Sequence, residues 1–90
     1  MRRVHVFITG NVQGVGLRYS LRNKAMRLKV NGFVKNLKDG RVEALFEGHD
    51  SDLNTMLGFC RRGTFVSKVT NVDAKEEPFR NEFREFEIRI

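Results

Sequence analysis

The chain has 90 residues, of which 40% are hydrophobic and 31% charged, with a single proline. This composition excludes a disordered or low-complexity protein, and the length suffices for one modest hydrophobic core. The formal net charge of +6 favours anionic partners without specifying the anion. We therefore expect residues 1–90 to form a single domain.

Compartment and broad partner class are also limited by composition. No apolar stretch is long enough for a transmembrane helix or for the hydrophobic part of a signal peptide. The only cysteine, Cys60, cannot form an internal disulfide, which suits a reducing compartment. We expect a cytoplasmic protein that binds neither membranes nor nucleic acid, because its basic residues are dispersed apart from Arg2-Arg3 and Arg61-Arg62.

The first half of the chain alternates between strand and helix patterns. Alternating apolar residues predict a strand over 3–9, and helical spacing predicts an amphipathic helix over 17–28. A second strand begins at Gly32, and the Asp39-Gly40 pair predicts a tight hairpin turn into a third strand over 41–47. The residues expected on buried faces are Val4, Val6, Ile8, Leu17, Leu21, Ala25, Leu28, Val42, Ala44 and Phe46.

The second half repeats the pattern. Asp50 or Ser51 is expected to cap a second helix that ends near Gly63. A fourth strand is expected over about 66–75, Pro78 interrupts the chain after it, and a last strand covers 86–90. The apolar positions of the second helix are Leu53, Met56, Leu57 and Cys60.

This element order predicts an α+β fold. A ferredoxin-like sandwich fits best: β-α-β-β-α-β with a short terminal β segment and two helices on one face of an antiparallel sheet. The crossover through the first helix should be right-handed. The first and second strands should then be parallel and flank the third.

A glycine-rich segment joins the first strand to the first helix. Residues 10–18 have the sequence Gly-Asn-Val-Gln-Gly-Val-Gly-Leu-Arg. Glycines allow tight turns and close approach of the backbone, and a helix start directs unpaired N–H groups at an anion. Arg18 would add a planar fork of donors. Such turns are often only turns, and the segment matches neither the Walker A nor the dinucleotide-binding pattern.

Asn36 is expected at the same edge of the sheet as this segment, because it lies near the carboxyl end of the second strand. It shares the phase of Val30 and Val34, which would place its amide on the helix-bearing face. An amide there could hold a water molecule against a bound phosphoryl group.

Both segments resemble the signatures of the acylphosphatases: residues 10–18 the first, and Gly32-Phe33-Val34-Lys35-Asn36 with Gly40, Val42 and Gly48 the second. The resemblance covers essentially the whole chain. It implies hydrolysis of the carboxyl–phosphate bond of acyl phosphates without metal or organic cofactor. It further implies that Arg18 binds phosphate and Asn36 positions the attacking water. The backbone N–H groups that would form the cradle belong to Gln13, Gly14, Val15, Gly16, Leu17 and Arg18.

The resemblance also implies the partners. The substrate would be a small-molecule acyl phosphate, and inorganic phosphate would be both product and competitive inhibitor. We expect a monomer. Leu17 occupies a place more often held by Phe in that family, which bears on turnover rate more than on reaction type.

Two alternatives stay open on the sequence alone. One is an inactive acylphosphatase-like regulatory domain, although Arg18 and Asn36 are both present. The other is an RNA-binding ferredoxin-like module, which would need exposed aromatic residues on the third strand that residues 41–47 lack. His5 and His49 lack a partner pattern, and no metal-ligand spacing is present.

Overall fold

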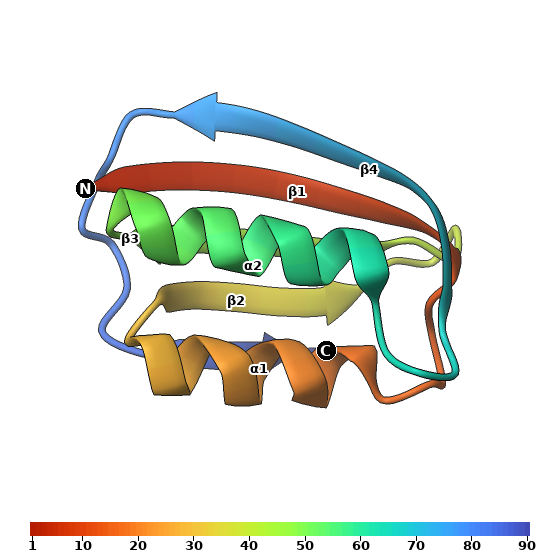
Figure 1. Cartoon of the computed structure of the whole chain (residues 1–90). Helices are drawn as coiled ribbons and strands as arrows, with labels where there is room; N and C mark the ends of the chain where they lie inside the picture. The colour runs from red at the N-terminus through yellow and green to blue at the C-terminus, as the bar shows by residue number, and fades with distance from the viewer.

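The computed structural model describes residues 1–90 and contains two helices and five strands. Both helices lie on one face of the sheet (Figure 1). The predicted bounds of the first helix are confirmed. The elements are β1 (Arg2–Asn11), α1 (Leu17–Leu28), β2 (Asn31–Asn36), β3 (Val42–Gly48), α2 (Asp50–Arg62), β4 (Lys68–Glu77) and β5 (Phe86–Arg89).

The sheet has the strand order β4-β1-β3-β2-β5. β3 pairs antiparallel with β1 and with β2, so β1 and β2 are parallel and flank β3 as predicted. β4 pairs antiparallel with β1, whereas β5 pairs parallel with β2. The sheet is therefore mixed rather than wholly antiparallel. Residues 78–85 connect β4 to β5. Because β5 begins beside the start of β2, where Phe86 pairs with Gly32, the two strands run in the same direction (Figure 1).

One hydrophobic core fills the space between the helices and the sheet. The alternating residues of β1 and β3 and the helical apolar positions are almost fully buried there, as the sequence predicts. Leu28 is only partly buried against this core. Because full burial of a large apolar side chain stabilises a protein by about 1.5–3 kcal/mol, this layer holds the helices in place.

β1, β2 and β3 begin or end one or two residues from their predicted limits, and three elements in the second half of the chain also differ. The N-cap of α2 is His49, in extended conformation, and its carbonyl accepts the first helical hydrogen bond from Leu53 N–H at 3.0 Å. Asp50 therefore lies in the first helical turn, where its charge favours the helix dipole. β4 covers Lys68–Glu77, because residues 64–67 form a turn closed by side-chain hydrogen bonds. β5 ends at Arg89, and Ile90 is exposed.

The sheet face away from the helices carries a second, smaller set of buried groups. Phe33, Leu45 and Phe83 form an apolar cluster there. Arg3 and Glu47 are buried beside it, 6% and 3% exposed. Alternation along β3 predicts an exposed Glu47. Its burial arises because residues 78–85 cover this end of the face and donate two backbone N–H groups to its carboxylate.

Candidate active site

The segment between β1 and α1 forms an open loop at the end of the sheet. Gly14 and Gly16 have φ of +73° and +77°, a region that disfavours residues with a Cβ. A Cβ on either glycine would meet no atom within 4 Å, so the space beside the loop is open. Gly16 is the N-cap of α1 and provides no side-chain cap, and the first turn has no acidic residue. The positive end of the helix dipole is therefore uncompensated.

Two hydrogen-bonded braces hold this loop. The Gln13 side-chain amide donates to the carbonyl oxygens of Leu37 and Arg41, at 2.7 and 2.9 Å, on the turn between β2 and β3. From the other side, the Thr64 hydroxyl donates to the Val15 carbonyl at 3.3 Å. Beneath the loop, Leu17 is 1% exposed and belongs to the core. The loop is thus fixed at three places, although the open space above it is unfilled by side chains.

A hollow of about 240 Å³ lies above the loop, and residues of both β2 and α1 line it. Asn36, at the end of β2, contributes to its wall as the topology predicts. The Asn36 Oδ1 atom is buried and accepts no hydrogen bond from the chain. Buried polar atoms are nearly always satisfied, so this acceptor requires an explanation. The lining residues are Val12, Gly14, Gly16, Leu17, Arg18, Tyr19 and Asn36.

Arg18 supplies the charge of this hollow. Its side chain is half-buried, and none of the ion pairs in the structure involves it. Its guanidinium lies 5.9 Å from the centre of the Tyr19 ring, which carries no formal charge. An uncompensated guanidinium beside an uncapped helix start attracts anions, and its fork suits a phosphoryl group.

The structure brings together most but not all of the residues that the sequence predicts for the site. Gly14, Gly16, Leu17, Arg18 and Asn36 line one hollow. Gln13 and Val15 are not on its wall, and their side chains brace the loop and pack on the core instead. Whether their backbone N–H groups bind phosphate stays a prediction.

Two lining residues are absent from the sequence-based set: Val12 and Tyr19. Val12 is 1% exposed and forms part of the core, whereas the Tyr19 side chain is more than half-exposed. The signal that could have identified Tyr19 is its position directly after Arg18 in the first turn of the helix.

The other potentially reactive side chains, Cys60 and His5, lie outside the hollow, in the core and on the sheet face away from the helices. Burial raises the pKa of the Cys60 thiol to about 12, so Cys60 is a core residue and not a thiolate nucleophile. His5 is held between the carboxylates of Glu43 and Glu77, at 2.6 and 3.1 Å, on the sheet face away from the helices. No group of three or more His, Cys, Asp or Glu side chains is placed to hold a metal ion.

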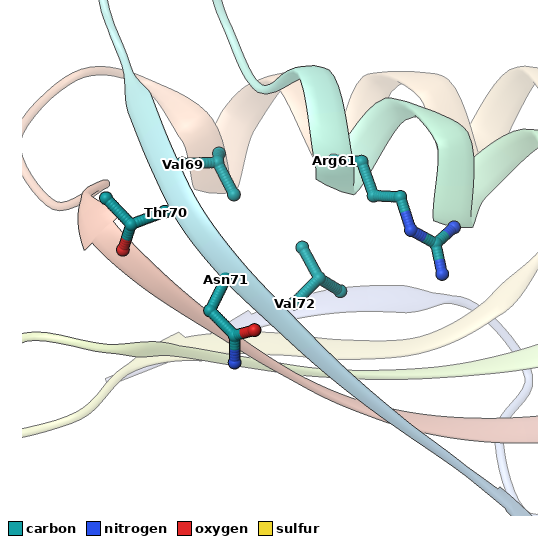
Figure 2. A pocket seen from close by; sticks show the side chains of 5 residues that line it. All are labelled: Arg61, Val69, Thr70, Asn71 and Val72. Carbon is teal, nitrogen blue, oxygen red and sulfur yellow. The ribbon is translucent and has the colours of Figure 1, made fainter.

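A second hollow, of about 330 Å³, lies between α2 and the edge strand β4 (Figure 2). Arg61 projects over it from the helix, and Val69 and Val72 come from the strand. Neither of the two buried side-chain atoms without a hydrogen-bond partner, Asn36 Oδ1 and Arg22 Nε, belongs to its lining. Thr70 and Asn71 complete the lining, but their side chains point away from Arg61 (Figure 2), so the hollow offers no convergent set of polar groups.

Known proteins similar to this chain identify its family. The family model described as Acylphosphatase matches residues 4–88. The chain belongs to the acylphosphatase family. It is therefore a hydrolase whose substrate class is small-molecule acyl phosphates. No helix has the length and apolar character needed to cross a membrane.

Individual acylphosphatases match over nearly their whole length. One from Syntrophobacter fumaroxidans is 48% identical over 87 residues, 97% of this chain and 90% of that protein. The crystal structure of the Bacillus subtilis acylphosphatase superposes with a TM-score of 0.95 at 36% identity, covering 100% of both chains. The Coxiella burnetii acylphosphatase gives a TM-score of 0.92 at 33% identity, covering 98% of this chain and 92% of that one.

Proposed function

We propose that Arg18 and the loop over 13–18 bind the phosphoryl group of the substrate and that Asn36 positions the attacking water. One observation carries the proposal. The unpaired Arg18 guanidinium and the buried, unsatisfied Asn36 oxygen line the same hollow above an uncapped helix start. The guanidinium and the backbone donors can neutralise phosphoryl charge, while the amide oxygen can accept a hydrogen bond from water.

This donor set suits a reaction that needs no strong acid or base. An acyl phosphate is a mixed anhydride, and its carboxylate leaves without being protonated. The water oxygen forms a bond to phosphorus as the bond between phosphorus and the carboxylate oxygen breaks, and the carboxylate takes the electron pair. Neutral Asn36 is a poor base, so a proton of the water passes to a phosphate oxygen of the substrate. The products are a carboxylate and dihydrogen phosphate, and catalysis is positional and electrostatic.

Partners and compartment are part of the same proposal. Inorganic phosphate resembles the bound phosphoryl group, so it should inhibit in competition with the substrate. We propose a single domain over 1–90 that acts as a monomer in the cytoplasm, consistent with a lone buried thiol.

The RNA-binding alternative is less well supported. Its aromatic residues would have to project from the central strands on the face that the helices leave open. On β3 that face carries Glu43, Leu45 and Glu47, and the two carboxylates would repel phosphate. Only a measurement of acyl phosphate hydrolysis distinguishes an inactive regulatory domain from the enzyme.

Hydrolysis of benzoyl phosphate tests the proposal. The wild-type chain should release phosphate, with added phosphate raising KM and leaving kcat unchanged. Asn36→Ala should lower kcat by about 100-fold because the water loses its orientation. Its inhibition constant for phosphate should stay close to the wild-type value, since Arg18 is intact. Steady-state kinetics with phosphate as inhibitor measure both quantities.

Asn31→Ala is the matched control, at the other end of the same strand. The Asn31 side chain donates to the Phe83 carbonyl at 3.1 Å, so its loss should cost about 1 kcal/mol of stability and leave kcat unchanged. Weakened phosphate inhibition with an intact kcat in Asn36→Ala would reverse the assigned role. A wild-type chain that binds RNA and hydrolyses no acyl phosphate would support the alternative.

A further inference from the structure

The hollow above the loop has only one exposed apolar side chain. Val12 and Leu17, which form its floor, are each 1% exposed and belong to the core. Gly14 and Gly16 have no side chain to offer. Tyr19 differs from all of these, since it is large, lies on the wall and is 53% exposed.

Two cations restrict the Tyr19 ring. The Arg18 guanidinium carbon lies 5.9 Å from the ring centre, and that of Arg22, one turn further along α1, lies 5.4 Å away. Such distances allow cation–π attraction. The ring therefore has a favoured position at the mouth of the hollow without being buried, and a tyrosine has few rotatable bonds to fix when it binds a ligand.

We propose that Tyr19 contacts the acyl group of the substrate and gives the enzyme a preference for aromatic acyl phosphates. This inference rests on the proposed binding of the phosphoryl group by Arg18 and the loop. With the phosphoryl group held there, the acyl group must point away from the sealed floor toward the mouth. Tyr19 is the only lining residue with a large hydrophobic side chain that is exposed.

An aromatic acyl group gains more from this contact than a small one. A flat benzoyl group can stack on the tyrosine ring or meet it edge to face, whereas an acetyl group offers a single methyl. A contact between aromatic rings changes a rate constant by about 2- to 12-fold. The structure thus assigns Tyr19 as a specificity-determining residue, separate from the groups that bind phosphate.

The test compares kcat/KM for benzoyl phosphate and acetyl phosphate in the wild type, Tyr19→Gln and Tyr19→Phe. The wild type should prefer benzoyl phosphate. In Tyr19→Gln the ratio of the two kcat/KM values should fall about fivefold, mainly through the benzoyl substrate. Tyr19→Phe should keep the wild-type ratio because the ring remains. The inhibition constant for inorganic phosphate should be the same in all three proteins.

Met26→Gln is the matched control, because Met26 lies two turns further along α1, is 61% exposed and does not line the hollow. It should leave the ratio unchanged. If Tyr19→Gln lowers activity on both substrates equally and weakens phosphate inhibition, Tyr19 acts by positioning Arg18, and the inference is wrong. An unchanged ratio in Tyr19→Gln also overturns the inference. The proposed function still stands in that case if the wild-type chain hydrolyses both substrates. A wild-type chain that hydrolyses neither substrate overturns both.

Discussion

Arg3 and Arg18 lie at opposite ends of the molecule, and the chain surrounds them in opposite ways. The Arg3 guanidinium contacts the carboxylates of Glu77, Glu47 and Glu82, at 2.9, 3.2 and 2.8 Å. Arg18 lines an open hollow and contacts no carboxylate. Arg3 is the more deeply buried of the two.

This difference separates a structural charge, Arg3, from the charge that we propose binds the phosphoryl group, Arg18. A buried cation is tolerated when carboxylates compensate it, and removing one member of such a group leaves an uncompensated charge. A cation left without a partner keeps its full attraction for a ligand. We infer that charge compensation, more than residue type or burial, distinguishes the two arginines. Changing each should therefore affect a different property.

The largest expected effect is on the activity of Arg18→Ala. Without the guanidinium, the developing phosphoryl charge loses its only cationic partner in the hollow. We expect kcat/KM to fall by about 10³-fold, equivalent to about 4 kcal/mol. The free energy of unfolding should change by no more than about 0.5 kcal/mol, because no ion pair is lost. Steady-state kinetics and urea unfolding measure the two quantities.

Two further variants sharpen this result. Arg18→Lys keeps the charge but not the planar fork, so it should recover only part of the activity. Arg27→Ala removes a charge from the last turn of the same helix and should leave kcat/KM unchanged. Wild-type turnover in Arg18→Ala would refute the assignment of Arg18.

Arg3→Met should have the opposite profile. The buried Glu47 carboxylate would lose its guanidinium partner, at a cost of about 3 kcal/mol in the free energy of unfolding. The value of kcat should stay within about twofold of wild type below the unfolding transition. Arg2→Met is the matched control, because its partners Asp50 and Glu76 are 76% and 58% exposed and their ion pairs contribute less than about 1 kcal/mol. Equal costs for the two variants would contradict the comparison.

Local patterns account for most of the fold that the sequence predicts. Helical spacing defines the first helix, and strand alternation defines the inner faces of β1 and β3, because each depends on neighbours within one element. The Arg3 network depends instead on Glu77 and Glu82, which are 74 and 79 residues away. Alternation alone marks Arg3 and Glu47 as exposed, yet they are 6% and 3% exposed. Their burial arises from residues 78–85 crossing the sheet.

The part of the site that follows from the topology can be predicted from the sequence. A right-handed crossover places the end of β2 beside the start of α1, and this brings Asn36 to the loop before any side chain is considered. Tyr19 is different, since helical phase alone marks it as an ordinary exposed residue. The structure places it on the wall of the hollow, with Arg18 and Arg22 near its ring. In the sequence, the only signal for this placement is that Tyr19 directly follows Arg18 in the first turn of the helix.

The smallest expected effect concerns the pH dependence of stability at the Arg3 end. Burial opposes ionisation of Glu47, but hydrogen bonds from the Arg80 and Glu82 N–H groups and from Arg3 lower its pKa below the ordinary value of 4.5. A carboxyl whose pKa is lower in the folded state stabilises the protein above its unfolded pKa. That stabilisation is lost as the pH falls through the folded pKa.

Glu47→Gln should reveal this contribution. It replaces charge-assisted hydrogen bonds with neutral ones, so at pH 7 it should cost about 2 kcal/mol in the free energy of unfolding. The difference from wild type should shrink as the pH falls below about 4.5, because the wild-type protein then loses the same contribution. Urea unfolding between pH 7 and pH 3 measures it. Glu87→Gln is the control, because the Glu87 side chain on β5 is 46% exposed and its loss should change stability little at any pH. A difference that stays constant down to pH 3 would show that the Glu47 charge is not what stabilises this end, and the contrast with Arg18 would then depend on Arg3 alone.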